Sequence, residues 1–99
     1  MEKDLKVFYM FNGLIMIAER INNDMNALQV KSALALAPGQ QQGVMSLMEA
    51  FPFTSMDEVL TLERGSFITM TELADPKIGD SYRDALTQIR AKKAGVILP

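Results

Sequence analysis

The chain contains no cysteine and no histidine among its 99 residues. Without cysteine, neither disulfides nor thiolate metal ligands can form. Without histidine, the sequence lacks the commonest general base and the commonest metal ligand. The acidic residues form no paired set typical of a catalytic centre. We therefore expect a protein that is not an enzyme and that holds no cofactor or metal.

An excess of positive charge is also missing. Ten Lys and Arg stand against twelve Asp and Glu, which gives a net charge of −2. A dedicated nucleic-acid-binding protein normally shows a basic excess. No apolar run approaches the roughly 18 residues of a membrane span, and no charged-then-apolar leader opens the sequence. We expect a cytoplasmic protein that does not associate with a membrane.

Hydrophobic residues, in contrast, are abundant: they make up 48% of the chain, with eight methionines. A chain of this length forms one domain, 1–99, which cannot bury all of that surface by itself. One interpretation is that part of it lies in a subunit interface, where methionine and aromatic residues are enriched. The other is a methionine-rich core, since methionine fills gaps well. Composition favours neither.

Two turn signals separate pairs of apolar segments. Asn12-Gly13 lies between two of them and predicts a hairpin with a type I′ turn, because both residues accept a positive φ. Arg64-Gly65 lies between two segments rich in β-branched residues and predicts a second hairpin. The segments are 4–11, 14–21, 58–63 and 66–73. In the first, Val7, Tyr9 and Phe11 alternate with Phe8 and Met10, so both faces are apolar and we expect at least the end of this strand to be covered on both.

The middle of the chain predicts further strands. Residues 27–36 alternate with period two, which indicates a strand with one buried face. That face carries Leu28, Val30, Leu34 and Leu36 together with Ser32. Segment 44–53 fits a strand that Pro52 confines to a sheet edge or a bulge, while 44–51 also fits a helix. The sequence leaves this choice open.

After Asp75-Pro76 the period becomes helical. Tyr82, Leu86 and Ile89 follow helix spacing, with Asp80 or Ser81 as N-cap and Asp84 as its capping partner. We predict a C-terminal helix and tail over about 79–99, and we expect the apolar tail 96–99 to dock on a neighbouring surface. The preceding strands, over about 4–73, would expose their edges unless the sheet closes. The fold class is therefore mainly β, a small and strongly bent antiparallel barrel with a C-terminal helix.

The order of these motifs resembles the Sm-like family of small β-barrels, which includes Sm, LSm and Hfq proteins. Asn12-Gly13 fills the turn of its first motif, Ile21 and Asn22 follow the second strand, and Met25-Asn26 ends the motif. Leu62-Glu63-Arg64-Gly65-Ser66-Phe67-Ile68 resembles the second motif. The chain is also similar to small Sm-like proteins of tailed phages of marine bacteria, in its Gln/Gly-rich loop, its Pro-Phe segment and its apolar C-terminal end.

The resemblance implies a five-stranded, SH3-type barrel that assembles into a ring of five to seven subunits and holds single-stranded RNA at the pore. It makes Asn26, Arg64 and Gly65 the candidate nucleic-acid-binding residues. Asn26 would bond a base edge, Arg64 would stack or contact phosphate, and Gly65 would let the backbone approach. Asp24 stands where the family carries a base-stacking side chain. Alone, Arg64 also fits a solvated turn residue or a partner of Glu63 or Asp24.

Two functional hypotheses follow. In the first, the protein is a ring-forming structural or interaction module whose pore contacts nucleic acid weakly. In the second, it is an RNA-binding regulator like LSm and Hfq proteins. A salt-dependent affinity for oligo-U or oligo-A would favour the second.

Overall fold

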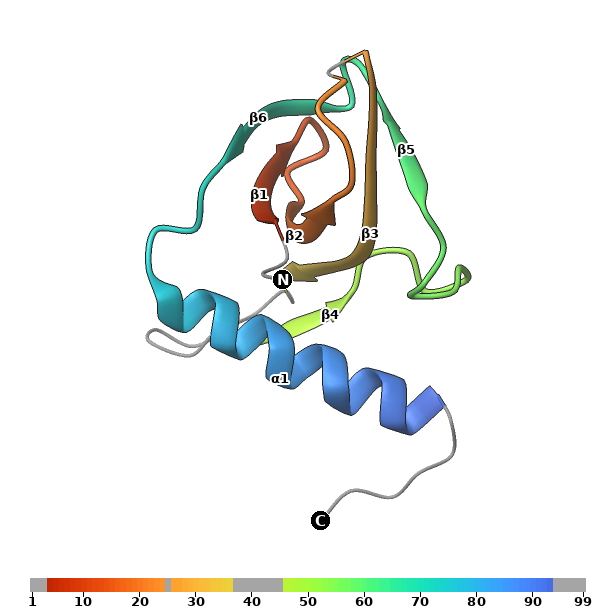
Figure 1. Ribbon diagram of the computed structural model, residues 1–99, viewed down its shortest axis with the longest axis vertical. Helices are drawn as coiled ribbons and strands as arrows, with labels where there is room; N and C mark the ends of the chain where they lie inside the picture. The colour runs from red at the N-terminus through yellow and green to blue at the C-terminus, as the bar shows by residue number, and fades with distance from the viewer. Residues whose placement is uncertain (1–3, 25, 37–45, 94–99) are drawn as a thin grey trace.

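The computed structural model describes residues 4–24, 26–36 and 46–93, and it is a mainly β structure with one C-terminal helix (Figure 1). All strand pairs are antiparallel, in the order β4-β3-β2-β1-β6, and β5 pairs with β3 beside this path. The elements are β1 (Leu5–Met10), β2 (Ile15–Arg20), β3 (Ala27–Leu36), β4 (Leu47–Glu49), β5 (Leu60–Glu63), β6 (Phe67–Thr71) and α1 (Pro76–Lys93).

The prediction of five strands is wrong, because the described residues contain six in one open sheet. Two short strands, β4 and β5, pair with different halves of the long strand β3. Between them Pro52 lies in a tight turn in which the Thr54 amide donates to the Phe51 carbonyl (3.1 Å). Within the described residues β4 is an edge strand, as predicted for this segment, and Pro52 follows the strand in this turn instead of forming a bulge within it. For 46–51, the described part of the segment, the strand alternative holds over β4 and the helix does not.

A bulge in the middle of β3 bends the sheet. The register with β2 shifts between the Ile17–Leu34 pair and the Glu19–Lys31 pair, and Ser32 has a φ of 55°. An extra residue in one strand reverses the alternation of side chains beyond it. The prediction of one buried face along 27–36 is therefore wrong: Leu28 and Val30 lie in one core cluster, but Leu34 lies in the other.

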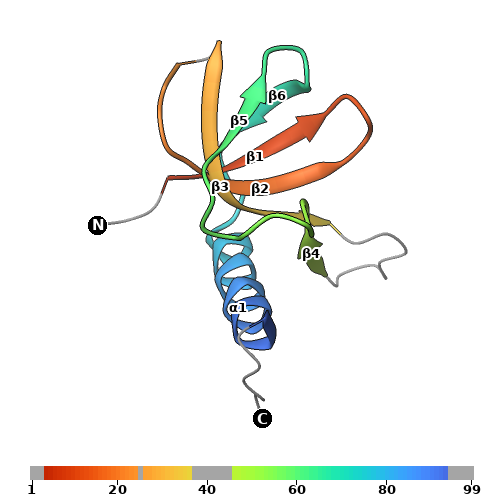
Figure 2. The same ribbon diagram turned by 90° about the vertical axis from the view of Figure 1, so that its right-hand side faces the viewer.

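The two core clusters lie on opposite faces of the sheet. The inner cluster is centred on Phe8, whose ring meets that of Phe67 edge-on at a centroid distance of 5.8 Å. The outer cluster lies under α1, where Tyr82 and Leu86 pack against strand residues such as Val7. Figure 2 shows α1 running away from the curled sheet, so the helix covers only part of the outer face. The prediction that the end of the first strand is covered on both faces is wrong within the subunit: both faces are covered earlier, at Val7 and Phe8, whereas Tyr9 and Phe11 are exposed.

Helix α1 begins earlier than predicted. Asp75 is the N-cap, since its carboxylate accepts the Lys77 amide (2.9 Å), and Pro76 is the first helical residue. The prediction of Asp80 or Ser81 as N-cap is wrong, because proline is well tolerated in the first turn, where its missing N–H has no helical partner. Asp80 instead pairs with Arg83 one turn later (2.6 Å).

The bend in β3 is tied to the helix and to the segment before β5. The Tyr82 hydroxyl donates to the Ser32 carbonyl (2.6 Å), and the Ser32 amide and hydroxyl both donate to the Met56 carbonyl (3.1 and 3.0 Å). Arg90 reaches the Ser32 hydroxyl (3.3 Å) and forms an ion pair with Asp57 (2.7 Å). Ser32 is thus the point at which three segments distant in sequence are joined.

An ion-pair network surrounds the start of β1. Lys6 is bound by Glu72 and lies 3.4 Å from Asp4, which also pairs with Arg20 (2.6 Å). The Glu72 hydrogen bond is the main cause that raises the pKa of Lys6 above its usual value. The network therefore joins the start of β1 to the ends of β2 and β6.

The turn at Asn12-Gly13 forms the predicted hairpin with a different geometry. The Met10 amide donates to the Leu14 carbonyl (2.9 Å), and the Met10 carbonyl accepts the Gly13 amide (3.0 Å). The loop between the two strands therefore has three residues, 11–13. Only Gly13 has a positive φ (89°) in it. The type I′ prediction is therefore wrong, since this is the common three-residue loop that closes with a glycine bulge.

Within the described residues, no helix has the length and apolar character needed to cross a membrane. The predicted docking of the tail 96–99 falls outside the described residues.

Candidate nucleic-acid interface

The two loops that carry the candidate residues lie side by side. Ala27, the first residue of β3, pairs with Glu63, the last residue of β5. This register places the β2–β3 loop next to the β5–β6 turn, and both lie together at the top of Figure 1. The structure thus brings Asn26 and Arg64, which are 38 positions apart in sequence, into neighbouring loops.

Asn26 and Arg64 are in direct contact: an Arg64 guanidinium nitrogen (Nη1) donates to the Asn26 side-chain oxygen (Oδ1) over 3.1 Å. A guanidinium has no acceptor, so Asn26 must turn its oxygen to Arg64 and its NH₂ group away. Both side chains are exposed. The sequence offered Arg64 as a solvated turn residue or as a partner of Glu63 or Asp24, whereas the structure records it exposed in the turn and bonded to the Asn26 amide.

Asp24 shapes the backbone of the β2–β3 loop. Its carboxylate accepts the Asn26 amide (3.0 Å), and its carbonyl accepts the Ala27 amide (3.1 Å). An Asp side chain that bonds the backbone two residues later is a common turn device. Asp24 therefore holds Asn26 in place, and it also puts a negative charge beside it.

Asn22 closes the same loop, a role that the sequence did not reveal. Its side-chain oxygen accepts the Gln29 amide (2.9 Å), and its NH₂ group donates to the Ala27 carbonyl (3.2 Å). The sequence signal was only its position, four residues before Asn26. Asn22 acts on the site through the loop backbone.

The prediction of a second hairpin at Arg64-Gly65 is wrong, because within the described residues β5 pairs with β3 and β6 with β1, although the turn itself joins them. Gly65 fits this turn because of its backbone. Its φ is 96°, and the Ser66 amide donates to the Glu63 carbonyl (3.0 Å), as in a type II turn, which requires a positive φ at the third residue. A Cβ placed on Gly65 would meet nothing within 4 Å. The space above the turn is therefore open to a ligand, and the glycine is favoured by its conformation rather than by crowding.

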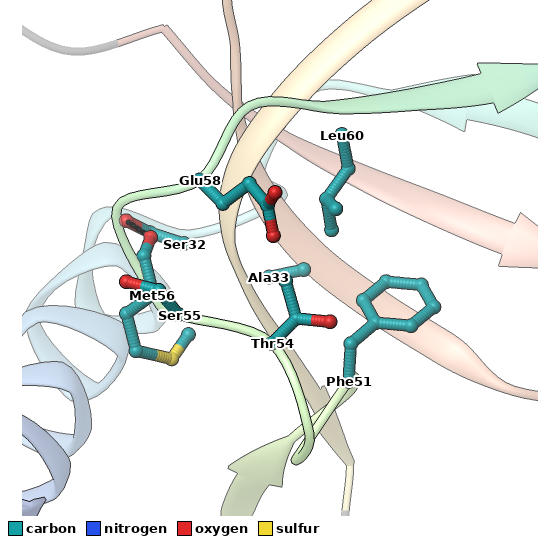
Figure 3. Close-up of a pocket in the computed structure, with 8 residues that line it drawn as sticks. All are labelled: Ser32, Ala33, Phe51, Thr54, Ser55, Met56, Glu58 and Leu60. Atoms are coloured by element: carbon teal, nitrogen blue, oxygen red, sulfur yellow. Dashed lines mark hydrogen bonds between the residues drawn. The ribbon is translucent and has the colours of Figure 1, made fainter.

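Two hollows of the surface are a small cavity and an open groove with a mostly apolar lining. One cavity has a volume of about 10 Å³, room for about one water, and lies between the β3 bend and the segment before β5 (Figure 3). An open groove of about 390 Å³ is lined by Asn12, Gly13, Leu14, Ile15, Leu36 and Met48. The described part of the chain contains no group of three or more carboxylates arranged to hold a metal ion. Neither hollow includes Asn26 or Arg64.

The chain matches no protein-family model, and a comparison with curated proteins finds no match.

Proposed function

We propose that the protein is a ring-forming Sm-like module whose β5 edge meets the β6 edge of the next copy. The observation that carries the proposal is a pair of separate exposed apolar patches, one beside each of these strands. β5 has β3 as its ladder partner and β6 has β1 within the described residues, so one side of each strand is free to pair. An assembly that covers both edges removes the aggregation hazard of an open sheet.

The β6 patch consists of Tyr9 on β1, Phe11 in the loop just after β1, and Ile68 on β6, which pairs with β1. Phe11 and Ile68 are 62% and 64% exposed, and the Phe11 amide donates to the Ser66 carbonyl (3.2 Å) at the start of β6. Side chains of this size are rarely left in water together on a protein that works as a monomer. Their clustering favours a protein contact at this edge.

The β5 patch consists of Phe51, Phe53 and Val59, in the segment that leads into β5. Phe53 is completely exposed, next to Pro52 in the turn described above. In Figure 1 this segment and β5 lie on the right, whereas β6 lies on the upper left. Two different patches on two sides suit a head-to-tail contact, and such contacts close into rings when the rotation between copies allows.

The arrangement of the loops supports the Sm-like barrel as the fold of each subunit. The register of β3 with β5 brings the β2–β3 loop beside the Arg64-Gly65 turn, so the two segments that resemble the Sm-like motifs lie next to each other. In a ring of copies, the outer edges of β5 and β6 would extend the sheet from one subunit into the next. Light scattering at micromolar concentration tests this: a stable species near 11.0 kDa contradicts assembly.

A weak contact with single-stranded RNA at the Asn26–Arg64 pair is part of the proposal. The bond between these side chains supports it, because it gathers donors from two loops into one exposed site. Repeating the site around a ring multiplies a weak contact. The net charge of −2 and the Asp24 carboxylate keep each contact weak, since both repel phosphate. The same bond would favour the second hypothesis, an RNA-binding regulator, if the affinity for RNA is high.

The replacement Asp24→Tyr is expected to tighten oligo-U binding, because it removes a negative charge and adds a stacking face worth about 1–3 kcal/mol per base. Asp24→Asn is the matched control: it removes the charge and retains a side-chain oxygen for the Asn26 amide. We expect a small gain for Asp24→Asn, a larger one for Asp24→Tyr and a loss for Arg64→Ala, all without a change of ring size. Filter binding at two salt concentrations measures these affinities.

Nanomolar affinity of the unmodified protein in 150 mM salt, where charges are screened over about 8 Å, contradicts a weak contact and favours the regulator. Unchanged affinity in all three variants removes these residues from any RNA site.

A further inference from the structure

We infer that Asn12 is a site of spontaneous covalent modification, at which its side-chain amide is lost and the β1–β2 loop, 11–13, acquires a carboxylate. The reacting groups are the Asn12 side chain and the backbone nitrogen of Gly13, and the co-reactant is water. The modification follows from the geometry of this loop alone. Its effect on assembly rests on the proposed ring.

The reaction is a ring closure followed by hydrolysis. The Gly13 nitrogen attacks the side-chain carbonyl carbon of Asn12, so a new N–C bond forms and the bond from that carbon to the NH₂ group breaks. The leaving group takes the Gly13 proton and departs as ammonia, which leaves a cyclic imide. Water then opens the imide: attack at the side-chain carbonyl gives aspartate, and attack at the main-chain carbonyl gives isoaspartate.

One hydrogen bond holds the reacting carbonyl over the peptide that follows it. The Leu14 amide donates to the Asn12 side-chain oxygen over 3.0 Å, so the side chain folds back across the peptide that contains the Gly13 nitrogen. The same donor faces the oxygen on which negative charge develops as the ring closes, which favours the attack. A Cβ on Gly13 would meet nothing within 4 Å, and both Asn12 and Gly13 are exposed to water.

A second hydrogen bond opposes the reaction. The Gly13 amide donates to the Met10 carbonyl over 3.0 Å, and this N–H must be released before the nitrogen can attack. One ordinary hydrogen bond of this kind is worth a factor of about ten at most. The loop therefore slows ring closure by about tenfold or less relative to the unfolded chain, and Asn12 stays reactive in the folded protein.

The other asparagines are placed less well for this attack. The side-chain oxygens of Asn22 and Asn26 bond other segments, at the backbone of β3 (2.9 Å) and at Arg64 (3.1 Å). These bonds hold each carbonyl toward its partner and not over its own following peptide. All three other asparagines, including Asn23, precede residues with a Cβ, which hinders the approach of the backbone nitrogen. Asn12 should therefore be modified first.

The two products differ in what they do to the loop. Aspartate retains a side-chain oxygen that can accept the Leu14 amide. Isoaspartate adds one atom to the main chain before Gly13, so the three-residue loop can no longer close on Met10 with the same bonds. Phe11 of the β6 patch lies in this loop, and its amide bonds the residue before β6 (3.2 Å). Isoaspartate therefore displaces part of the patch through which the proposed ring assembles.

Incubation of the full chain in mildly alkaline buffer, followed by trypsin digestion and mass spectrometry, tests the modification. Trypsin releases 7–20, which contains Asn12, separately from 21–31, which contains the other three asparagines. We expect 7–20 to gain the mass of one deamidation before 21–31 does, at a rate within about tenfold of the rate in guanidinium chloride. A larger slowing by the fold, or earlier modification of 21–31, overturns the inference.

Gly13→Ala tests the role of the missing Cβ and should slow the mass gain of 7–20. Gly65→Ala is the matched control, since both glycines have a positive φ (89° and 96°) and both have open space where the Cβ would lie. We expect Gly65→Ala to leave the rate at Asn12 unchanged. Equal rates in Gly13→Ala and the unmodified protein contradict attack by the Gly13 nitrogen.

Size-exclusion chromatography of the incubated protein tests the effect on assembly. We expect isoaspartate at position 12, identified by electron-transfer fragmentation, to be enriched several-fold in the monomer fraction, whereas Asn12→Asp assembles like the unmodified protein. Equal isoaspartate content in monomer and assembly, or loss of assembly in Asn12→Asp, overturns this effect. A protein that is monomeric before incubation contradicts the ring, while the mass of 7–20 still reports on the modification.

Discussion

Replacement of Tyr82 by alanine is expected to lower the free energy of unfolding by about 3–5 kcal/mol, the usual cost of deleting a large buried aromatic side chain. Tyr82 is 1% exposed and packs in the outer cluster, and its hydroxyl bonds the carbonyl at the β3 bend. The variant should therefore loosen the helix and the bend together. Urea unfolding followed by circular dichroism, at one fixed protein concentration, measures the loss.

Tyr82→Phe separates the hydroxyl from the ring. We expect a loss of about 1–2 kcal/mol, because the buried Ser32 carbonyl loses its donor. Equal stability of Tyr82→Phe and the unmodified protein would contradict an anchoring role for the hydroxyl.

The same residue predicts a loss of stability at alkaline pH. Burial is the main cause that raises the pKa of Tyr82 to about 12, from 10.0, with Glu19 as the second cause. The unfolded chain therefore ionises first, so the stabilisation is complete below pH 10 and falls by up to about 3 kcal/mol as the pH rises to 12. Lys6 also loses stabilising charge in this range. The difference between the unmodified protein and Tyr82→Phe isolates the tyrosine, and a constant difference from pH 9 to 12 contradicts the assignment.

Ile68→Lys is expected to dissociate the assembly into monomers, because a charge on an exposed edge strand opposes pairing with another chain. Val59→Lys in the β5 patch should do the same. Gln88→Lys is the control: it adds the same charge on an exposed part of α1 and should leave the assembly intact. Size-exclusion chromatography with light scattering gives the masses.

A mixture of the two patch variants distinguishes head-to-tail contacts from symmetric ones. Each variant keeps one intact patch, so a mixture should form a dimer of about 22 kDa and no larger species. If the two variants remain monomers when mixed, the β5 and β6 patches do not contact each other. If Ile68→Lys alone forms a ring, the β6 patch is not part of the interface.

The parts of the fold that follow from local chemistry could be predicted from the sequence. Gly13 and Gly65 mark the two turns, and both have a positive φ. Helix spacing also identified Tyr82 and Leu86 as buried residues of one helix. These signals are local, because a turn or a helix face depends on residues within a few positions of each other.

The parts of the fold that depend on contacts between distant segments could not be predicted from the sequence. The positive φ of Ser32 has no sequence signal, since serine seldom adopts it and the Met56 and Tyr82 contacts that accompany it come from far along the chain. The bond between Asn26 and Arg64 likewise depends on the register of β3 with β5. The helix start is different: Asp75-Pro76 is itself a recognisable cap signal, but the sequence prediction placed the N-cap later, at Asp80 or Ser81.

Native mass spectrometry of the unmodified protein, with and without a short single-stranded RNA, tests the central claim most directly. We predict one species of about 55–77 kDa, an integer multiple of 11.0 kDa corresponding to about five to seven copies, with the same number of subunits when RNA is added. A species of 11.0 kDa, or a dimer of about 22 kDa that does not grow with concentration, would contradict the ring.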